Sequence, residues 1–297
     1  MKIVKRTAVV IISVILLAIV CIKVFLVLML PDASLKRYLE KETSKNFDEF
    51  YYTFGESTFK SNRGMNDERI LKDVQCVCIY NNALYYFTSP KYTTAVLMSV
   101  DLTTKEHRNI LSIQIPIKLY RTELCVRTVE SSYTGEYCHA YCYDNNIVIE
   151  CNDNTTLYNL ATGKITEIET SSLHDPREEY ESIEVEKEKI TIVPKQGEVR
   201  TVTAERMAEM DDVAKKLYKY SQNKTNVFSP KIKMEFERVA FYNDEMYIVM
   251  LIYDAGGWAY LVYYHYVPES DALDFWCGVF INDAADSDEV SVLPYAE

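Results

Sequence analysis

Hydrophobic residues follow different patterns along the chain, and the first is a nearly uninterrupted apolar run from Ala8 to Leu30. As a helix this run would be about 35 Å long, which matches the roughly 30 Å hydrocarbon core of a bilayer. A cleavable signal peptide has a shorter apolar core, followed by small residues at the cleavage site. No Ala-x-Ala pattern follows Leu30. The run therefore predicts a transmembrane helix over residues 8–30.

Charged residues on either side of this segment set its expected orientation. Lys2, Lys5 and Arg6 precede it without any acid, whereas the basic residues that follow it are mixed with acids. By the positive-inside rule, residues 1–7 form a cytoplasmic tail and the C-terminal domain is extracytoplasmic. Lys23 lies near the outer end of the segment, where its long side chain can extend to the interface. We expect a single-pass membrane protein, with the membrane contacted through residues 8–30.

A helical pattern follows the apolar segment and recurs later in the chain. Leu35, Tyr38 and Leu39 fall at helical spacing in a charged stretch that ends near Asn46, so residues 31–70 are expected to form a stalk and lead-in. Residues 203–220 predict one inserted amphipathic helix with Thr203 as its N-cap. Its apolar positions are Met207, Met210, Val213, Ala214 and Leu217.

From Val74 onward, short alternating or apolar runs separated by Asn and Asp predict many short strands. Residues 71–297 are therefore expected to form a β-rich exterior domain. In three places an aromatic residue enters an Asn/Asp turn and an apolar strand leaves it, at 79–85, 142–148 and 241–247. After the first two places comes a second shared motif, at 99–105 and 158–165.

These repeated units resemble the blades of β-propellers, in which the second turn commonly joins the two outer strands. The first copy has Lys105 where glycine is usual, and the third replaces the motif by Val267-Pro268-Glu269-Ser270-Asp271. A weaker fourth unit spans residues 183–202, and successive turns are then 63, 44 and 55 residues apart. Known blades repeat every 40 to 50 residues or so. The resemblance implies a mainly β, propeller-like array of antiparallel sheets of no specific family; a β-sandwich or another β-rich fold is the alternative.

Composition and charge restrict the possible partners. The 297 residues are 48% hydrophobic and 26% charged, as in ordinary globular proteins. There are 32 basic and 44 acidic residues, for a net charge of −12, and the part after residue 30 carries −16. A nucleic-acid-binding protein needs a basic face, so nucleic acid is not an expected partner.

Residues with reactive side chains form no recognisable catalytic, metal or cofactor motif. Cys76 and Cys78 are two apart on an expected strand, which would place them on one face, and Cys138 and Cys142 are a similar pair. These cysteines lack the Cys-x-x-Cys spacing of structural zinc sites, so a zinc site is not expected. Most of them are expected to be core residues, and one or two disulfides are an alternative. The Ser57-Thr58-Phe59-Lys60 tetrapeptide matches a Ser-x-x-Lys nucleophile pattern without its partner motifs.

Aromatic residues concentrate between Tyr253 and Trp276, and this stretch holds both tryptophans. Four of them, Trp258, Tyr260, Tyr264 and Tyr266, would alternate onto one strand face. Exposed, they would form a binding surface for a protein or a glycan. Buried, they would pack between neighbouring sheets.

The sequence therefore predicts a membrane-anchored extracytoplasmic protein that binds a protein or a glycan. A binding role is favoured over an enzymatic one. The alternatives are an exported hydrolase that acts on envelope or extracellular polymer, and an assembly factor of a membrane complex. Convergent titratable groups in a concave surface would favour the enzyme, whereas a broad aromatic or acidic face would favour binding.

Overall fold

The computed structural model describes residues 33–55, 57–61, 67–72, 74–91, 94–114, 124–126, 138–151, 154–169, 176–222, 232–242, 244–253, 259–281, 287, 290–293 and 295–296. The expected cytoplasmic tail at 1–7 and transmembrane helix at 8–30 lie outside these ranges. Among the helices within them, none has the length and apolar character to cross a membrane.

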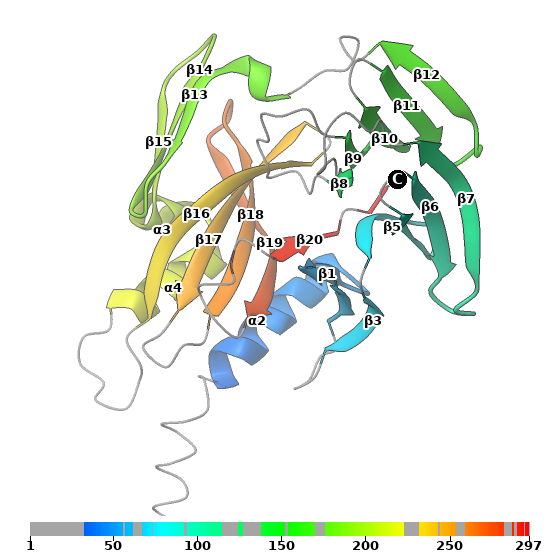
Figure 1. Cartoon of the computed structure of the whole chain (residues 1–297). Coiled ribbons are helices and arrows are strands. Elements are labelled where there is room, and N and C mark those ends of the chain that lie inside the picture. Colours follow the sequence, from blue (N-terminus) through cyan, green and yellow to red (C-terminus); the bar gives the residue numbers. More distant parts are fainter. Residues whose placement is uncertain are drawn as a thin grey trace, which may run out of the picture.

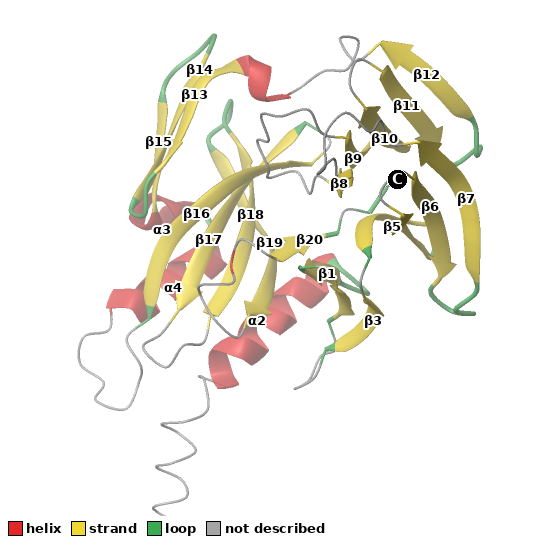
Figure 2. Ribbon diagram, viewed as in Figure 1, coloured by secondary structure: helices red, strands yellow, loops and turns green. Residues whose placement is uncertain are grey.

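The described strands form five separate sheets that are arranged as the blades of a propeller (Figure 1). This arrangement confirms the mainly β fold and the resemblance to propeller blades, and it excludes the sandwich. Figure 2 shows that the helices lie on one side of the molecule, against the sheets that follow residue 176.

Blades 2 and 3 hold the first two repeats. Blade 2 consists of β4 (Gln75–Tyr80), β5 (Ala83–Lys91), β6 (Thr94–Asp101) and β7 (His107–Gln114), paired in that order. Blade 3 consists of β9 (Cys138–Tyr143), β10 (Asn146–Cys151), β11 (Asn154–Asn159) and β12 (Ile165–Glu169), with the short β8 (Leu124–Val126) parallel to β9.

Blades 4 and 5 hold the later repeats and the helices. The 3-10 helix η2 (Pro176–Glu179) leads into blade 4, which consists of β13 (Tyr180–Val185), β14 (Lys189–Pro194) and β15 (Arg200–Thr203). Helices α3 (Ala204–Met210) and α4 (Asp212–Gln222) follow. Blade 5 consists of β16 (Lys233–Tyr242), β17 (Glu245–Tyr253), β18 (Ala259–Val267) and β19 (Ala272–Ile281).

Blade 1 is built from both ends of the domain. It consists of β1 (Tyr51–Phe54), β2 (Ser57–Lys60) and β3 (Glu68–Lys72), and the C-terminal strand β20 (Val290–Val292) pairs with β1. After β20, the Ala296 N–H donates to the carbonyl of Ile79 in blade 2 at 2.8 Å. Residues 31–70 were expected to form a stalk and lead-in, whereas β1, β2 and β3 belong to this blade. A local pattern could not show it, because the partner strand lies more than 200 residues away.

The Asn/Asp turns occupy equivalent positions in successive blades, as the repeats predicted. They join the first two antiparallel strands of blades 2, 3 and 5, and the polar turn at 186–188 does the same in blade 4. Asn81, Asn82, Asp144 and Asp244 have positive φ, which Asn and Asp tolerate better than most residues. Left-handed turn residues therefore mark the repeat.

The second motif joins the third strand of a blade to its outer strand, also as predicted. The Leu102 N–H donates to Asn82 O at 2.9 Å in blade 2, and the Leu160 N–H donates to Asn145 O at 2.7 Å in blade 3. The same hydrogen bond thus connects the two turns of each blade.

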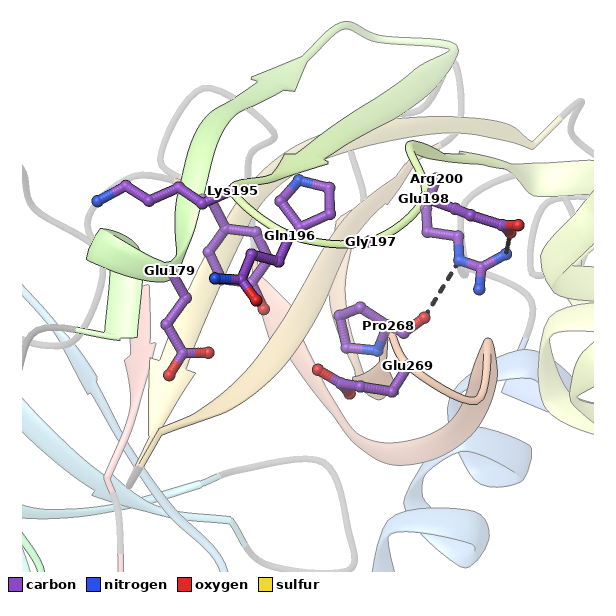
Figure 3. Close-up of a pocket in the computed structure, with 10 residues that line it drawn as sticks. Glu179, Lys195, Gln196, Gly197, Glu198, Arg200, Pro268 and Glu269 are labelled. Atoms are coloured by element: carbon purple, nitrogen blue, oxygen red, sulfur yellow. Dashed lines mark hydrogen bonds and ion pairs between the residues drawn. The ribbon is translucent and has the colours of Figure 1, made fainter.

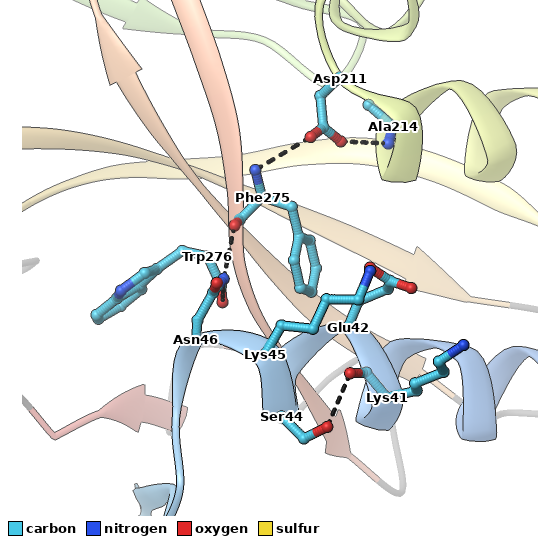
Figure 4. Close-up of polar contacts among 9 residues, drawn as sticks. All are labelled: Lys41, Glu42, Ser44, Lys45, Asn46, Asp211, Ala214, Phe275 and Trp276. Carbon is cyan, nitrogen blue, oxygen red and sulfur yellow. Dashed lines mark hydrogen bonds and ion pairs between the residues drawn. The ribbon is translucent and has the colours of Figure 1, made fainter.

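The inserted segment at 203–220 forms two helices where one was predicted. Thr203 is the N-cap of α3, as expected, and its Oγ1 accepts the N–H of Arg206 at 3.2 Å. Asp211 then adopts an extended conformation (φ −133°, ψ 138°) that ends α3. Its carboxylate accepts the N–H of Ala214 at 2.7 Å and the N–H of Phe275 in β19 at 3.2 Å (Figure 4). The break follows from this bond to blade 5, which helical periodicity cannot reveal.

Helix α2 (Ala33–Asn46) packs along the outer strand of blade 5. Its Asn46 side-chain amide donates to the carbonyls of Phe275 and Trp276 at 2.9 and 2.8 Å (Figure 4), and the Gly278 N–H donates to Thr43 Oγ1 at 3.0 Å. At the other end of α2, the Lys36 ammonium lies over the Phe280 ring. The helix therefore covers the polar edge of β19, which would otherwise be open to pairing with another strand.

The hydrophobic core is divided among the spaces between blades. Separate clusters lie between blades 1 and 2, between blades 2 and 3, and between blades 5 and 1. The cluster with most residues joins blades 4 and 5 to α2, α3 and α4. Among the described residues, each blade is thus buried against at least one neighbouring blade, which is how a small sheet gains stability.

Candidate functional site

A pocket of about 570 Å³ opens between blades 4 and 5, and ten residues line it (Figure 3). Three segments meet there: the end of η2, the turn between β14 and β15, and the turn between β18 and β19. Six of the ten lining residues have polar or charged side chains, and Tyr180, Pro194 and Pro268 add apolar surface.

The turn between β14 and β15 forms one wall of the pocket. Gly197 has a φ of +115°, a conformation that side chains rarely adopt, so glycine is required here. The N–H of Lys195 donates to the carbonyl of Glu179 at 2.8 Å, which fixes this turn to η2. In Figure 3 the Lys195 side chain extends away from the side of the pocket formed by Pro268 and Glu269.

The turn between β18 and β19 forms the opposite wall, and Arg200 connects the two. Its Nε donates to the carbonyl of Pro268 at 3.2 Å, and its Nη1 pairs with Glu198 Oε2 at 3.2 Å. The Arg200 guanidinium therefore holds blade 4 to blade 5 beside the pocket and offsets the charge of Glu198.

A hydrogen bond and an ion pair made by Asp271 stabilise the turn between β18 and β19. Asp271 has a positive φ of 52° and accepts a hydrogen bond from the buried Tyr266 hydroxyl at 2.8 Å. Its other carboxylate oxygen pairs with Arg206 of α3. Burial opposes ionisation of Asp271, yet the bonds from Arg206 and Tyr266 hold its pKa below the usual range. The pocket wall is thus braced by a charged aspartate.

Two carboxylates and an aromatic ring share the open side of the pocket. Glu179 and Glu269 both line it next to Tyr180, whose ring packs on Phe241 with centroids 6.1 Å apart. Burial raises the pKa of Tyr180, and the negative charges of Glu269 and Glu179 raise it further. The arrangement places two negative charges and an aromatic ring in the lining of one pocket, which favours a cation.

The four aromatic residues predicted to form a binding face have a different role. Tyr260, Tyr264 and Tyr266 do share one face of β18, as alternation predicted, but they are only 5%, 0% and 1% exposed. Trp258 lies outside the described residues. Because at least two of the four rings had to be exposed, burial of these three removes the proposed surface. Helices from elsewhere in the chain cover the face, which strand periodicity does not show.

Sequence reasoning missed most of the pocket, although two signals pointed to it. Glu179 belongs to an acidic run whose described members are all exposed, consistent with a solvated face. The turn at Val267–Asp271 was noted only as a departure from the second motif of the repeat. This divergent turn contains Pro268 and Glu269, which line the pocket. The pocket therefore forms where blade 5 differs from the repeat.

The reactive residues do not assemble into a catalytic centre in the part of the chain that the structure describes. Ser57 and Lys60 begin and end strand β2, where positions three apart point to opposite faces, and Lys60 pairs with Glu49. Within the same described residues, no group of three His, Cys, Asp or Glu side chains could hold a metal ion.

Comparisons with known proteins place this chain in no family. No family model matches it, and no curated protein does. Its similarities are to solved β-propeller proteins. The N-terminal domain of Nup159 shares 12% identity over 80% of this chain, with a TM-score of 0.28. TolB from Acinetobacter baumannii shares 10% over 83%, with a TM-score of 0.31. A putative 6-phosphogluconolactonase from Bacteroides fragilis shares 8% over 80%, with a TM-score of 0.27.

The chain spans 59% of the Nup159 domain, 66% of TolB and 83% of the putative lactonase. At this level of similarity these proteins supply no argument about ligand or activity. The class defined by the fold and the pocket is therefore a five-bladed, propeller-type protein with a pocket of mixed polar and apolar lining between blades 4 and 5.

Proposed function

We propose that this protein is a membrane-anchored extracytoplasmic binding protein whose pocket between blades 4 and 5 takes a cationic segment of a protein partner. The observation that carries the proposal is the position of Glu179 and Glu269 beside the ring of Tyr180. A lysine or arginine side chain placed there would meet two carboxylates and an aromatic ring together.

Charge supports the same partner. The chain after residue 30 carries a formal charge of −16, so its surface attracts a basic segment and repels an anionic one. A pocket of about 570 Å³ is large enough for one or two side chains of a bound polypeptide. The partner is therefore expected to present a short basic segment at its surface.

The pocket is also well placed on an anchored protein. Helix α2 begins at Ala33, three residues after the predicted transmembrane segment, and its first turns lie at the Phe280 end of β19. The pocket lies at the other end of that strand, beyond Ala272. Ten residues of strand span about 33 Å. A bilayer at the start of α2 would thus leave the pocket open to partners.

Fluorescence anisotropy with a labelled nona-lysine peptide tests the proposal on the full-length protein in detergent micelles. Replacing both carboxylates, Glu179→Gln with Glu269→Gln, removes the charges that face the ring. Exposed ion pairs contribute up to about 1 kcal/mol each, so for two pairs we expect affinity to fall by about fivefold to thirtyfold.

A matched control removes the same charge elsewhere. Glu106→Gln with Glu167→Gln changes two exposed glutamates on blades 2 and 3. These substitutions should leave affinity within about twofold, because long-range attraction is screened at physiological salt. Equal losses in both double variants would show that the peptide responds only to net charge, which would contradict a site between blades 4 and 5.

A further inference from the structure

Two cysteines expected to share a strand face point to different sides of blade 2. Strand β4 has a register shift opposite β5, with Cys76 paired to Tyr86 and Cys78 paired to Tyr85. A bulge of this kind reverses the alternation of side chains. Cys76 consequently lies in the cluster between blades 1 and 2, and Cys78 lies in the cluster between blades 2 and 3. The earlier expectation that the two thiols share a face is therefore wrong.

The bulge brings Cys78 to a third cysteine on the neighbouring blade. Cys142 on β9 packs against the same cluster, and β4 contacts β9 directly. After burial, which is the larger cause, the neighbouring Cys142 side chain also raises the pKa of the Cys78 thiol. Cys78 is completely buried, whereas Cys142 is partly exposed. Both thiols are free in the structure, and one of the two can be reached from solvent.

We propose that Cys78 and Cys142 form a disulfide that joins β4 of blade 2 to β9 of blade 3 when the domain is in an oxidising compartment. The proposal concerns the scaffold and does not depend on which partner the pocket binds. A disulfide needs two cysteines that face each other at close range, and this pair bridges two blades that no other described covalent bond connects.

Glutathione disulfide can serve as the two-electron oxidant for this bond. The partly exposed Cys142 thiolate attacks one sulfur of glutathione disulfide and releases one glutathione thiolate. The Cys78 thiolate then attacks the Cys142 sulfur of the mixed disulfide and releases the second. The two cysteines lose two protons and two electrons in total, and glutathione disulfide is reduced to two glutathiones. Burial raises the pKa of the Cys78 thiol, so the second step is expected to be the slow one.

Cys76 and Cys277 occupy environments separate from this pair. Cys76 Sγ lies 2.7 Å from Thr58 Oγ1 on blade 1, and Cys277 is buried in the cluster between blades 5 and 1. These two residues therefore supply matched controls, since each is a buried free cysteine of the same protein.

Mass spectrometry on the full-length protein tests the bond. The protein is incubated with glutathione disulfide, its remaining thiols are alkylated, and it is digested with trypsin without reduction. We expect a linked pair of peptides, 73–91 with 128–164, because trypsin leaves each of these segments whole. Cys78→Ala and Cys142→Ala should each reduce this pair at least about tenfold, whereas Cys76→Ala and Cys277→Ala should retain it.

Thermal unfolding gives a second readout. A cross-link that closes a loop of some 60 residues constrains the unfolded chain, so reduction should lower the melting temperature of the oxidised wild type by about 10 °C and leave Cys142→Ala unchanged. No linked peptide in the wild type, or its persistence in Cys78→Ala, would overturn the proposal. Cys142 is partly exposed, so its alanine variant should fold even if Cys78→Ala does not.

Discussion

Single turn residues distinguish blades that are otherwise built alike. The second turn of blade 2 has Lys105 at a φ of 61°, where the equivalent turn of blade 3 has Gly163 at 69°. The Lys105 N–H donates to the carbonyl of Asp101, and the Gly163 N–H donates to the carbonyl of Asn159. The two acceptors occupy equivalent positions in the two turns. The conformation is thus set by the turn, and only glycine adopts it without strain.

Lys105→Gly should therefore stabilise the protein. Glycine relieves the left-handed strain but gains freedom in the unfolded chain, so the net gain is expected to be about 0.5–1 kcal/mol in the free energy of unfolding. Urea unfolding measures it, and Gly163→Lys, the reverse change in blade 3, should lose a similar amount. A loss of stability in Lys105→Gly would contradict the equivalence of the two turns.

The same pair of turns predicts a pH effect confined to blade 2. Asp101 accepts the N–H groups of Thr104 and Thr103 at 2.7 and 2.9 Å, and these bonds hold its pKa below the usual value. A lowered pKa in the folded state stabilises the fold above the unfolded-state pKa, near 4. That contribution disappears as the pH falls through the folded-state pKa.

In blade 3 the amide of Asn159 accepts the Thr162 N–H at 2.9 Å in place of a carboxylate. Amide hydrogen-exchange protection measured between pH 5 and pH 3 should therefore fall at Thr103 and Thr104 and stay constant at Thr162. Asp101→Asn should remove the difference. Equal acid sensitivity in both turns would contradict the assignment.

Local sequence predicted these residues well wherever backbone conformation decides the residue type. It placed the left-handed turns of the repeat correctly, because Asn, Asp and Gly are chosen for that conformation. It failed for Tyr260, Tyr264 and Tyr266, whose exposure depends on helices elsewhere in the chain, and for Cys76 and Cys78, which a bulge separates. Side-chain surroundings need non-local contacts that a local pattern does not contain.

Among the elements, the α3–α4 break depends most on a tertiary contact. Asp211 is the N-cap of α4 and also binds the backbone of β19. Burial raises its pKa, against the lowering effect of the backbone bonds. The carboxylate therefore holds two elements together at some electrostatic cost.

Asp211→Ala should destabilise the protein by about 1–3 kcal/mol, because it removes the cap and leaves the Phe275 N–H without its acceptor. Asp212→Ala is the matched control, because Asp212 is the adjacent residue in the chain and its side chain is exposed. Chemical unfolding of both variants measures the difference. Similar stability in the two would show that Asp211 does not connect α4 to blade 5.

Element prediction succeeded for helices and strands with a strong local pattern, such as the helix ending at Asn46. It placed β1, β2 and β3 in a stalk because strands of four or five residues carry little periodicity. Their assignment depends on β20, which only the folded chain brings beside them.

At the scale of the whole molecule, the ring closes through the C-terminal strand, and Arg238 secures it. The Arg238 guanidinium donates to the carbonyls of Ser287 and Val290 at 2.9 and 2.7 Å and to the Tyr263 hydroxyl at 3.1 Å. These bonds hold the segment that leads into β20 against blade 5.

Arg238→Ala should lower the free energy of unfolding by about 2–3 kcal/mol, since hydrogen bonds from a charged group are among the stronger ones. Amide exchange should rise most in β20 and β1, where blade 1 closes. Lys233→Ala, an exposed change on the same strand, is the control. Uniform exchange across all blades in Arg238→Ala would contradict a local role in closure.

The proposed binding of a basic segment from outside the cell, in the pocket between blades 4 and 5, can be tested directly on cells. The most direct measurement adds a lysine-rich peptide with a photoreactive group to intact cells that make the full-length protein, and maps the cross-linked residues. We predict cross-links at Gln196 and Glu269, with a strong loss in the variant that combines Glu179→Gln and Glu269→Gln. Cross-links confined to blades 2 and 3, or none from outside the cell, would contradict it.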